Sequence, residues 1–115
     1  MMKDIKVGIV QHAFGEDVDA NRARNITGIE NLAAEGAQLV VLSELHDSIY
    51  FCQTENVENF RYADEIPSEF TEIYSAAARD NNVVVVASMF ERRAPGLYHN
   101  TALVFDRDGS IAGKY

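Results

Sequence analysis

Apolar residues along the chain follow two patterns that alternate. The first pattern is a short, largely apolar segment, and it occurs at four places: Ile5 with Val7, Ile9 and Val10, then Leu39–Leu42, Val83–Ala87 and Thr101–Phe105. Short runs of this kind, bounded by turn residues, are typical of buried strands. The pattern therefore predicts a sheet whose first strands are separated by other elements.

The second spacing repeats every three or four residues and predicts two helices. The first helix opens at Asp17–Asp19 and is closed by Gly36, which we expect in the left-handed conformation. The second runs from Pro67 or Ser68 to about Asp80, with Ser68 as the N-cap. The expected inner faces are Ala23, Ile26, Ile29, Leu32 and Ala33 in the first helix, and Phe70, Ile73, Tyr74 and Ala77 in the second.

The chain ends in a predicted hairpin. Arg107, Asp108 and Gly109 join the strand Thr101–Phe105 to a last strand, Ser110–Tyr115, and Asp-Gly between two such runs is a hairpin signal. The element order is therefore βαβαβ followed by a β-hairpin, which indicates an α/β fold with an antiparallel edge. Because no cap or helix follows the last strand, we expect a domain that continues beyond this chain.

Glu44 is the strongest candidate for a functional residue. It follows the apolar run Leu39–Leu42 after a single serine and precedes a loop that extends to about Ile66. Open α/β sheets bind ligands at the carboxyl ends of their strands. We therefore expect the Glu44 carboxylate to lie where such a fold places its chemistry.

Composition narrows the classes of function. With 18 acidic and 10 basic residues, the formal net charge is −8. Binding to nucleic acid or to an anionic membrane surface needs clustered Lys and Arg, so the charge argues against both kinds of partner. The six-residue stretch Ile5–Val10 is too short for a signal sequence or a membrane span. The single cysteine, Cys52, excludes an internal disulfide and a zinc site built on cysteine pairs. A cytoplasmic protein is the expectation.

Several short motifs occur at separated places: Ser43-Glu44-Leu45, Tyr50-Phe51-Cys52-Gln53, Phe90-Glu91-Arg92, Tyr98-His99-Asn100-Thr101 and the stretch from Asp108 to Tyr115. Together, and in this order, they resemble the carbon-nitrogen hydrolases of the nitrilase superfamily. The resemblance covers the chain from Lys6 onward. Within the superfamily it is strongest to N-carbamoylputrescine amidohydrolase-like enzymes.

The resemblance implies a Glu-Lys-Cys triad on a four-layer αββα sandwich, of which this chain is the N-terminal part. Only the glutamate maps onto the sequence, as Glu44. The catalytic Lys of the family would lie just beyond Tyr115 and is not Lys114, and the nucleophilic Cys comes later still. Residues 1–115 are thus expected to form a partial domain, truncated before the catalytic Lys and Cys and inactive alone. The family needs no metal or organic cofactor, and its members tend to form homo-oligomers.

The implied substrate is a small carbamoyl amine or amide, with N-carbamoylputrescine as the expected one. Tyr50 is a candidate substrate-binding residue, because its ring could hold a distal amine by a cation–π interaction. His46 is a second candidate, because it lies two residues after Glu44. A carboxylate-bearing substrate such as an N-carbamoyl amino acid would need an arginine, and Arg92 and Arg93 leave that alternative open, as they do ω-amide hydrolysis.

Other interpretations of single residues are less favoured. Cys52 lies eight residues from Glu44, but a free cysteine usually behaves as a small buried hydrophobe. His12, His46 and His99 with Asp47 have no recognised spacing of metal ligands. The glycines of Gly109–Lys114 are too close for a phosphate loop. For the chain as a whole, a non-catalytic α/β binding or assembly module remains the alternative to an amidohydrolase.

Overall fold

A computed structural model describes residues 4–47, 60 and 62–115 and contains one five-stranded sheet. Its strands are β1 (Val7–Ile9), β2 (Leu39–Val41), β3 (Val84–Ala94), β4 (Leu97–Phe105) and β5 (Ile111–Lys114), and they lie in the order of the sequence. The pairs β1/β2 and β2/β3 are parallel, whereas β3/β4 and β4/β5 are antiparallel. The predicted order, βαβαβ followed by a hairpin, is confirmed.

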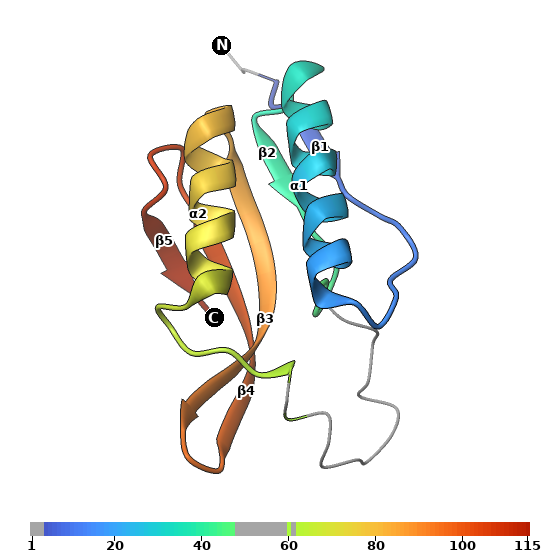
Figure 1. The fold of residues 1–115 in the computed structure, drawn as a ribbon. Helices are drawn as coiled ribbons and strands as arrows, with labels where there is room; N and C mark the ends of the chain where they lie inside the picture. Colours follow the sequence, from blue (N-terminus) through green and yellow to red (C-terminus); the bar gives the residue numbers. More distant parts are fainter. Residues whose placement is uncertain (1–3, 48–59, 61) are drawn as a thin grey trace.

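Two helices, α1 (Val18–Ala34) and α2 (Glu69–Asn81), lie side by side on one face of the sheet (Figure 1). The Asp17 side chain caps α1 by accepting a hydrogen bond from the Ala20 backbone N–H. Gly36, just beyond α1, has φ = +95°, as expected of the left-handed position after a helix. Ser68 is the N-cap of α2, and the Thr71 side chain accepts a hydrogen bond from its backbone N–H.

The core lies between this helical layer and the sheet. Ile29, Phe70, Tyr74, Val40, Val85, Leu103 and Phe105 are among its almost fully buried side chains. The inner face of α2 follows the prediction. The expected inner face of α1 is wrong at its start, because Ala23 is exposed and the buried stripe consists of Asn21, Arg22, Asn25 and Ile29.

A second difference from prediction is the length of the hairpin between β3 and β4. Both strands were expected to be five residues long, yet β3 continues to Ala94 and β4 begins at Leu97, with Gly96 at φ = +77° in the turn. The exposed residues Arg92 and Arg93 conceal this part of β3 from a hydropathy pattern. Alternate side chains of β3 stay buried through Met89 and Glu91, and only its last residues, Arg92–Ala94, are exposed and held by pairing with β4.

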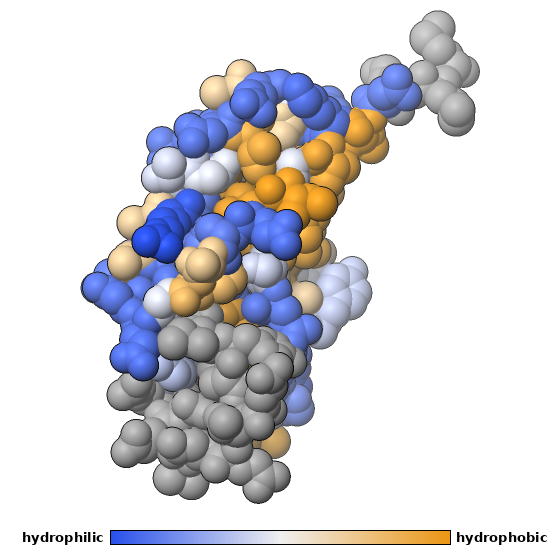
Figure 2. All heavy atoms as spheres, turned by 90° about the vertical axis from the view of Figure 1, so that its right-hand side faces the viewer, coloured by the Kyte–Doolittle hydropathy of each residue, from blue (hydrophilic) through white to orange (hydrophobic). Residues whose placement is uncertain are grey.

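The face of the sheet opposite the helices carries two rows of apolar side chains. One row crosses Val7, Leu39 and Val84, and the next crosses Ile9, Val41 and Val86. These six residues form the open face, on which Val7 is 53% and Ile9 69% exposed. Figure 2, seen from the side of β1 and α1, shows hydrophobic residues gathered next to a hydrophilic surface.

Of the two helices that the structure describes, neither is long and apolar enough to cross a membrane.

Candidate functional site

Glu44 lies where the sequence predicts it, in the turn that follows β2. The last ladder hydrogen bond between β2 and β3 runs from the Leu42 N–H to the Val86 carbonyl. The chain then turns over residues 44–47, and the Glu44 side chain is exposed to solvent. Within the described part of the chain, no hydrogen bond or ion pair holds the Glu44 carboxylate, so the backbone of this turn sets its position.

The turn itself is tightly fixed. Leu45 has φ = +48°, in the left-handed region that non-glycine residues rarely adopt. The residue is also buried, with 3% of its surface exposed. Its backbone N–H donates to Ser88 Oγ on β3, with 3.0 Å between the nitrogen and the oxygen. Strained backbone of this kind persists where surrounding contacts determine it, and it is concentrated at functional sites.

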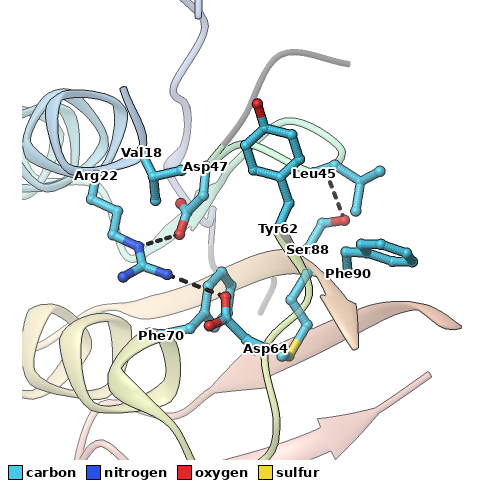
Figure 3. Close-up of a pocket in the computed structure, with 10 residues that line it drawn as sticks. Val18, Arg22, Leu45, Asp47, Tyr62, Asp64, Phe70, Ser88 and Phe90 are labelled. Carbon is cyan, nitrogen blue, oxygen red and sulfur yellow. Dashed lines mark hydrogen bonds and ion pairs between the residues drawn. The ribbon is translucent and has the colours of Figure 1, made fainter. Parts of the chain in front are cut away.

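Arg22 joins the turn to the first helix and to the segment before the second (Figure 3). Its Nε donates to Asp47 Oδ2 at 2.6 Å, and its Nη2 donates to Asp64 Oδ2 at 3.2 Å. The arginine side chain is only 9% exposed and that of Asp47 13%. Glu69 Oε2 lies 3.9 Å from Arg22 Nη1 as a third, more distant partner. The buried cation is thus paired, as buried charges must be.

Asp47 also accepts hydrogen bonds from His46 and Tyr74. The distance from His46 Nδ1 to Asp47 Oδ1 is 2.7 Å, and because an ionised carboxylate can only accept, Nδ1 carries the proton. Tyr74 donates its hydroxyl to the same oxygen from α2. The Asn21 amide on α1 donates to the Asp47 backbone carbonyl at 3.0 Å. Both helices therefore hold the end of the turn.

Burial and these contacts shift the pKa values of Asp47, Tyr74 and Asp64. Burial acts to raise the pKa of Asp47, but the hydrogen bonds and charge of His46, together with Tyr74 and Arg22, outweigh it and hold the pKa below its usual range. Burial and the Asp47 charge raise the pKa of Tyr74, so its phenol stays a donor. Burial also raises the pKa of Asp64, with Asp47 and Glu69 adding to the effect against the opposing charge of Arg22.

The cavity beside this cluster is small. It is bounded by Arg22, Asp47, Asp64, Leu45 and Phe70 (Figure 3) and encloses about 20 Å³, which is room for about one water molecule. Glu44 does not line it. The cluster therefore acts as a joint between the turn and the helices, and it is too small to hold a carbamoyl amine.

Of the two candidate substrate-binding residues, only His46 lies within the described part of the chain. His46 is fully buried and its ring packs against Phe70 and Tyr74, with ring centroids 5.5 and 4.8 Å away. This location favours support of the turn, and a role of His46 in substrate binding stays a prediction. Tyr50 and Cys52 lie outside the described residues.

The three histidines have different surroundings, although His12 and His46 both contact Asn25. His12 Nε2 is 2.9 Å from Asn25 Oδ1, His46 is bound to Asp47, and His99 is exposed on β4. Among residues 4–47, 60 and 62–115, no three His, Cys, Asp or Glu side chains form a group that could hold a metal ion.

Sequence reasoning missed Arg22 and Ser88. A signal for Arg22 was present, because Asn21, Arg22 and Asn25 continue the helical stripe of Ile29 backwards by eight, seven and four residues. A polar continuation of a buried stripe indicates a buried network of hydrogen bonds. Ser88 carries no such signal, since its contact with Leu45 depends on how the chain turns after β2.

Comparison with known proteins identifies the family. The model of the carbon-nitrogen hydrolase family matches residues 6–115. The chain belongs to the carbon-nitrogen hydrolase family. A crystal structure of a carbon-nitrogen hydrolase from Helicobacter pylori G27 superposes with a TM-score of 0.90 at 41% identity, covering 96% of this chain and 38% of that one. The fold is thus the N-terminal part of the carbon-nitrogen hydrolase fold.

Two curated relatives carry more specific names. A citrullinase from Francisella tularensis is 36% identical over 99% of this chain and 40% of its own length. An N-carbamoylputrescine amidase from Solanum lycopersicum is 30% identical over 96% of this chain and 37% of its own length. The chain therefore spans about two fifths of the length of these carbon-nitrogen hydrolases.

Proposed function

We propose that residues 1–115 form the N-terminal part of an amidohydrolase in which Glu44 is the general base. The observation that carries this proposal is the position of Glu44: an exposed carboxylate at the carboxyl end of β2, on a turn that its neighbours hold rigidly. The rest of the domain, with the catalytic Lys and Cys that the family resemblance implies, would follow Tyr115. Since these two groups are missing, the 115-residue chain alone should be inactive.

The chemistry assigns one task to each group. A thiol with its usual pKa of about 8.5 is mostly protonated at neutral pH, so a base must take its proton as it attacks the carbonyl carbon. Glu44 would accept that proton and return it to the departing ammonia. The Lys would stabilise the oxyanion, a contribution of about 3 kcal/mol for one well-placed donor. Water would then hydrolyse the thioester, for which Glu44 would again serve as the base.

For the substrate we propose a linear amine that carries a terminal carbamoyl group. Citrulline and N-carbamoylputrescine, after which the two curated relatives are named, share this group and differ by the carboxylate of citrulline. We propose N-carbamoylputrescine, which would be hydrolysed to putrescine, ammonia and carbon dioxide. The Tyr50 ring would contact the distal ammonium, an interaction of about 2 kcal/mol when desolvated.

A carboxylate-bearing substrate is the competing proposal, because it has a possible partner in the structure. Arg92 is exposed on β3, whereas the neighbouring Arg93 donates to Glu91 Oε1 at 3.3 Å and is partly neutralised. If the substrate carries a carboxylate, Arg92 is the available cation of this pair. Hydrolysis of ω-amides, a homo-oligomeric state and a cytoplasmic location also remain proposals for the complete enzyme.

The test is a comparison of substrates with the full-length enzyme and with residues 1–115. Ammonia release gives kcat/KM for N-carbamoylputrescine, citrulline, N-carbamoyl-β-alanine and a simple nitrile. We expect N-carbamoylputrescine to be preferred, Tyr50→Ala to reduce that preference, and the 115-residue chain to release no ammonia.

Two results would contradict parts of this proposal. A preference of about tenfold or more, or about 1.4 kcal/mol, for citrulline or N-carbamoyl-β-alanine would replace the substrate and leave the role of Glu44 intact. A downstream coding sequence without a Lys and a Cys would favour the non-catalytic module instead.

A further inference from the structure

The Glu44 carboxylate has no partner of its own among the described residues, although a general base must be placed accurately. A reacting group that is displaced by about 1 Å can lose about a hundredfold in rate. Its placement therefore depends on the backbone that leaves β2, and the left-handed Leu45 is the first residue of that backbone after Glu44.

Ser88 fixes this point of the backbone. In the parallel ladder the next acceptor on β3 after the Val86 carbonyl would be the carbonyl of Ser88, but the chain has already turned away from the sheet. The Ser88 side chain takes over as acceptor and receives the Leu45 N–H at 3.0 Å. The hydroxyl in turn donates to Asn100 Oδ1 at 3.3 Å, which directs an oxygen lone pair toward Leu45.

The opposite end of the turn is held by different elements. Asp47 is bound by Arg22 on α1 and by Tyr74 on α2. The turn is therefore attached to the helical layer at one end and to the sheet, through Ser88, at the other. Because the sheet contact lies next to Glu44, loss of the Ser88 hydroxyl would displace the carboxylate while Asp47 keeps the turn folded.

We infer that Ser88 is a positioning residue for Glu44, an inference that rests on the proposed function. Ser88 takes no part in proton transfer. It sets the direction in which Glu44 leaves the strand, and its loss should lower kcat more than it raises KM, because the base acts in the chemical step whereas substrate binding involves other groups.

The test uses three variants of the full-length enzyme at one position. Ser88→Ala removes the acceptor, Ser88→Cys keeps nearly the same size with a weak sulfur acceptor, and Ser88→Thr keeps the hydroxyl. We expect the Ala and Cys variants to lose about tenfold or more in kcat with KM within about twofold, and the Thr variant to stay within about threefold of the parent. Hydrogen exchange of the Leu45 amide should be faster in the Ala and Cys variants only.

Ser75→Ala is the matched control. It removes a hydroxyl that donates to the Gly109 carbonyl in the β4–β5 turn, at the opposite edge of the sheet, and it should leave kcat unchanged. If Ser88→Ala and Ser88→Cys keep the parent kcat, or if Ser75→Ala loses as much as they do, the inference is wrong. Glu44→Gln tests the proposed function separately, since an active Glu44→Gln enzyme would disprove the base and leave the Leu45 exchange result unaffected.

Discussion

Two carboxylates that bind Arg22 have pKa values shifted in opposite directions. The pKa of Asp47 is lowered because the contacts of His46, Tyr74 and Arg22 outweigh burial, whereas burial and the neighbouring acids raise the pKa of Asp64. Asp47 therefore stabilises the fold above the unfolded-state pKa of about 3.9, and that contribution is lost as the pH falls through its lowered pKa. For Asp64 the contribution is complete below about pH 3.9 and is lost as the pH rises through its raised pKa.

Asparagine substitutions at these two positions should separate the effects. Asp47→Asn should lower the free energy of unfolding by about 3 kcal/mol at neutral pH, because Arg22 loses its nearest partner. It should also flatten the loss of stability below about pH 3.9, while Asp64→Asn should change the slope only above that pH. Urea unfolding from about pH 2.5 to 6 measures both. If Asp47→Asn and the parent lose stability equally in acid, the assignment of Asp47 is wrong.

The sequence predicts the position of Glu44 after β2 but not the residues that hold its turn. Glu44 could be placed because an apolar run predicts where a strand ends. Arg22 was overlooked because the helix was read only for its apolar stripe, and Ser88 could not be found because its role depends on the left-handed conformation of Leu45. Tertiary contacts of this kind have no local pattern.

Among the elements, β1 and α1 meet at two glycines, Gly8 and Gly28. A Cβ added to Gly28 on α1 would lie 2.9 Å from a methyl group of Val10, and one added to Gly8 on β1 would lie 2.7 Å from Leu32 Cδ1. Val10 is buried and β-branched, so its side chain has little freedom to move away. The two glycines therefore permit the contact between this helix and the first strand.

Gly28→Ala should destabilise the protein despite the better helix propensity of alanine. Propensity favours the variant by about 1 kcal/mol, but overpacking against a fixed side chain costs about 1–3 kcal/mol. We expect a net loss of about 1 kcal/mol in thermal or urea unfolding. Gly15→Ala is the control, because an added Cβ there meets nothing within 4 Å. A Gly28→Ala protein more stable than its parent would show that the contact can relax.

The elements illustrate where hydropathy patterns succeed. Gly36, Ser68 and Gly109 mark boundaries that the structure confirms, because caps and turns depend on a few local residues. The outer half of the β3–β4 hairpin was missed, because the polar residues Ser88, Glu91, Arg92 and Arg93 interrupt the apolar run. For this reason β3 was predicted to end at Ala87, although alternate side chains stay buried as far as Glu91.

At the scale of the whole molecule, the open face is an apolar surface that no described segment covers. A groove of about 500 Å³ between β1 and α1, lined by Ile9, Val10 and Leu32 among others, continues it at the edge of the sheet. Contiguous apolar surface of this kind usually marks an interface or promotes association. The proposed remainder of the domain would supply the segments that cover it.

The 115-residue chain should therefore bind a hydrophobic dye or self-associate. Replacing Val7 and Ile9 together by threonine should lower dye fluorescence by about half, because these are the most exposed side chains of the open face. Leu97→Thr is the control, since Leu97 is 48% exposed but lies on the β3–β4 hairpin. A cooperative melt of a monomer that binds no dye would contradict the prediction.

The role of Glu44 is the central claim, and one comparison of turnover numbers tests it most directly. In the full-length enzyme acting on N-carbamoylputrescine, Glu44→Gln should lower kcat by about a hundredfold or more, the scale on which general bases contribute. Glu30→Gln makes the same chemical change on the exposed side of α1 and should leave kcat unchanged. Cys52→Ser should also leave it nearly unchanged. Full activity of Glu44→Gln, or a larger loss in Cys52→Ser, would contradict the account.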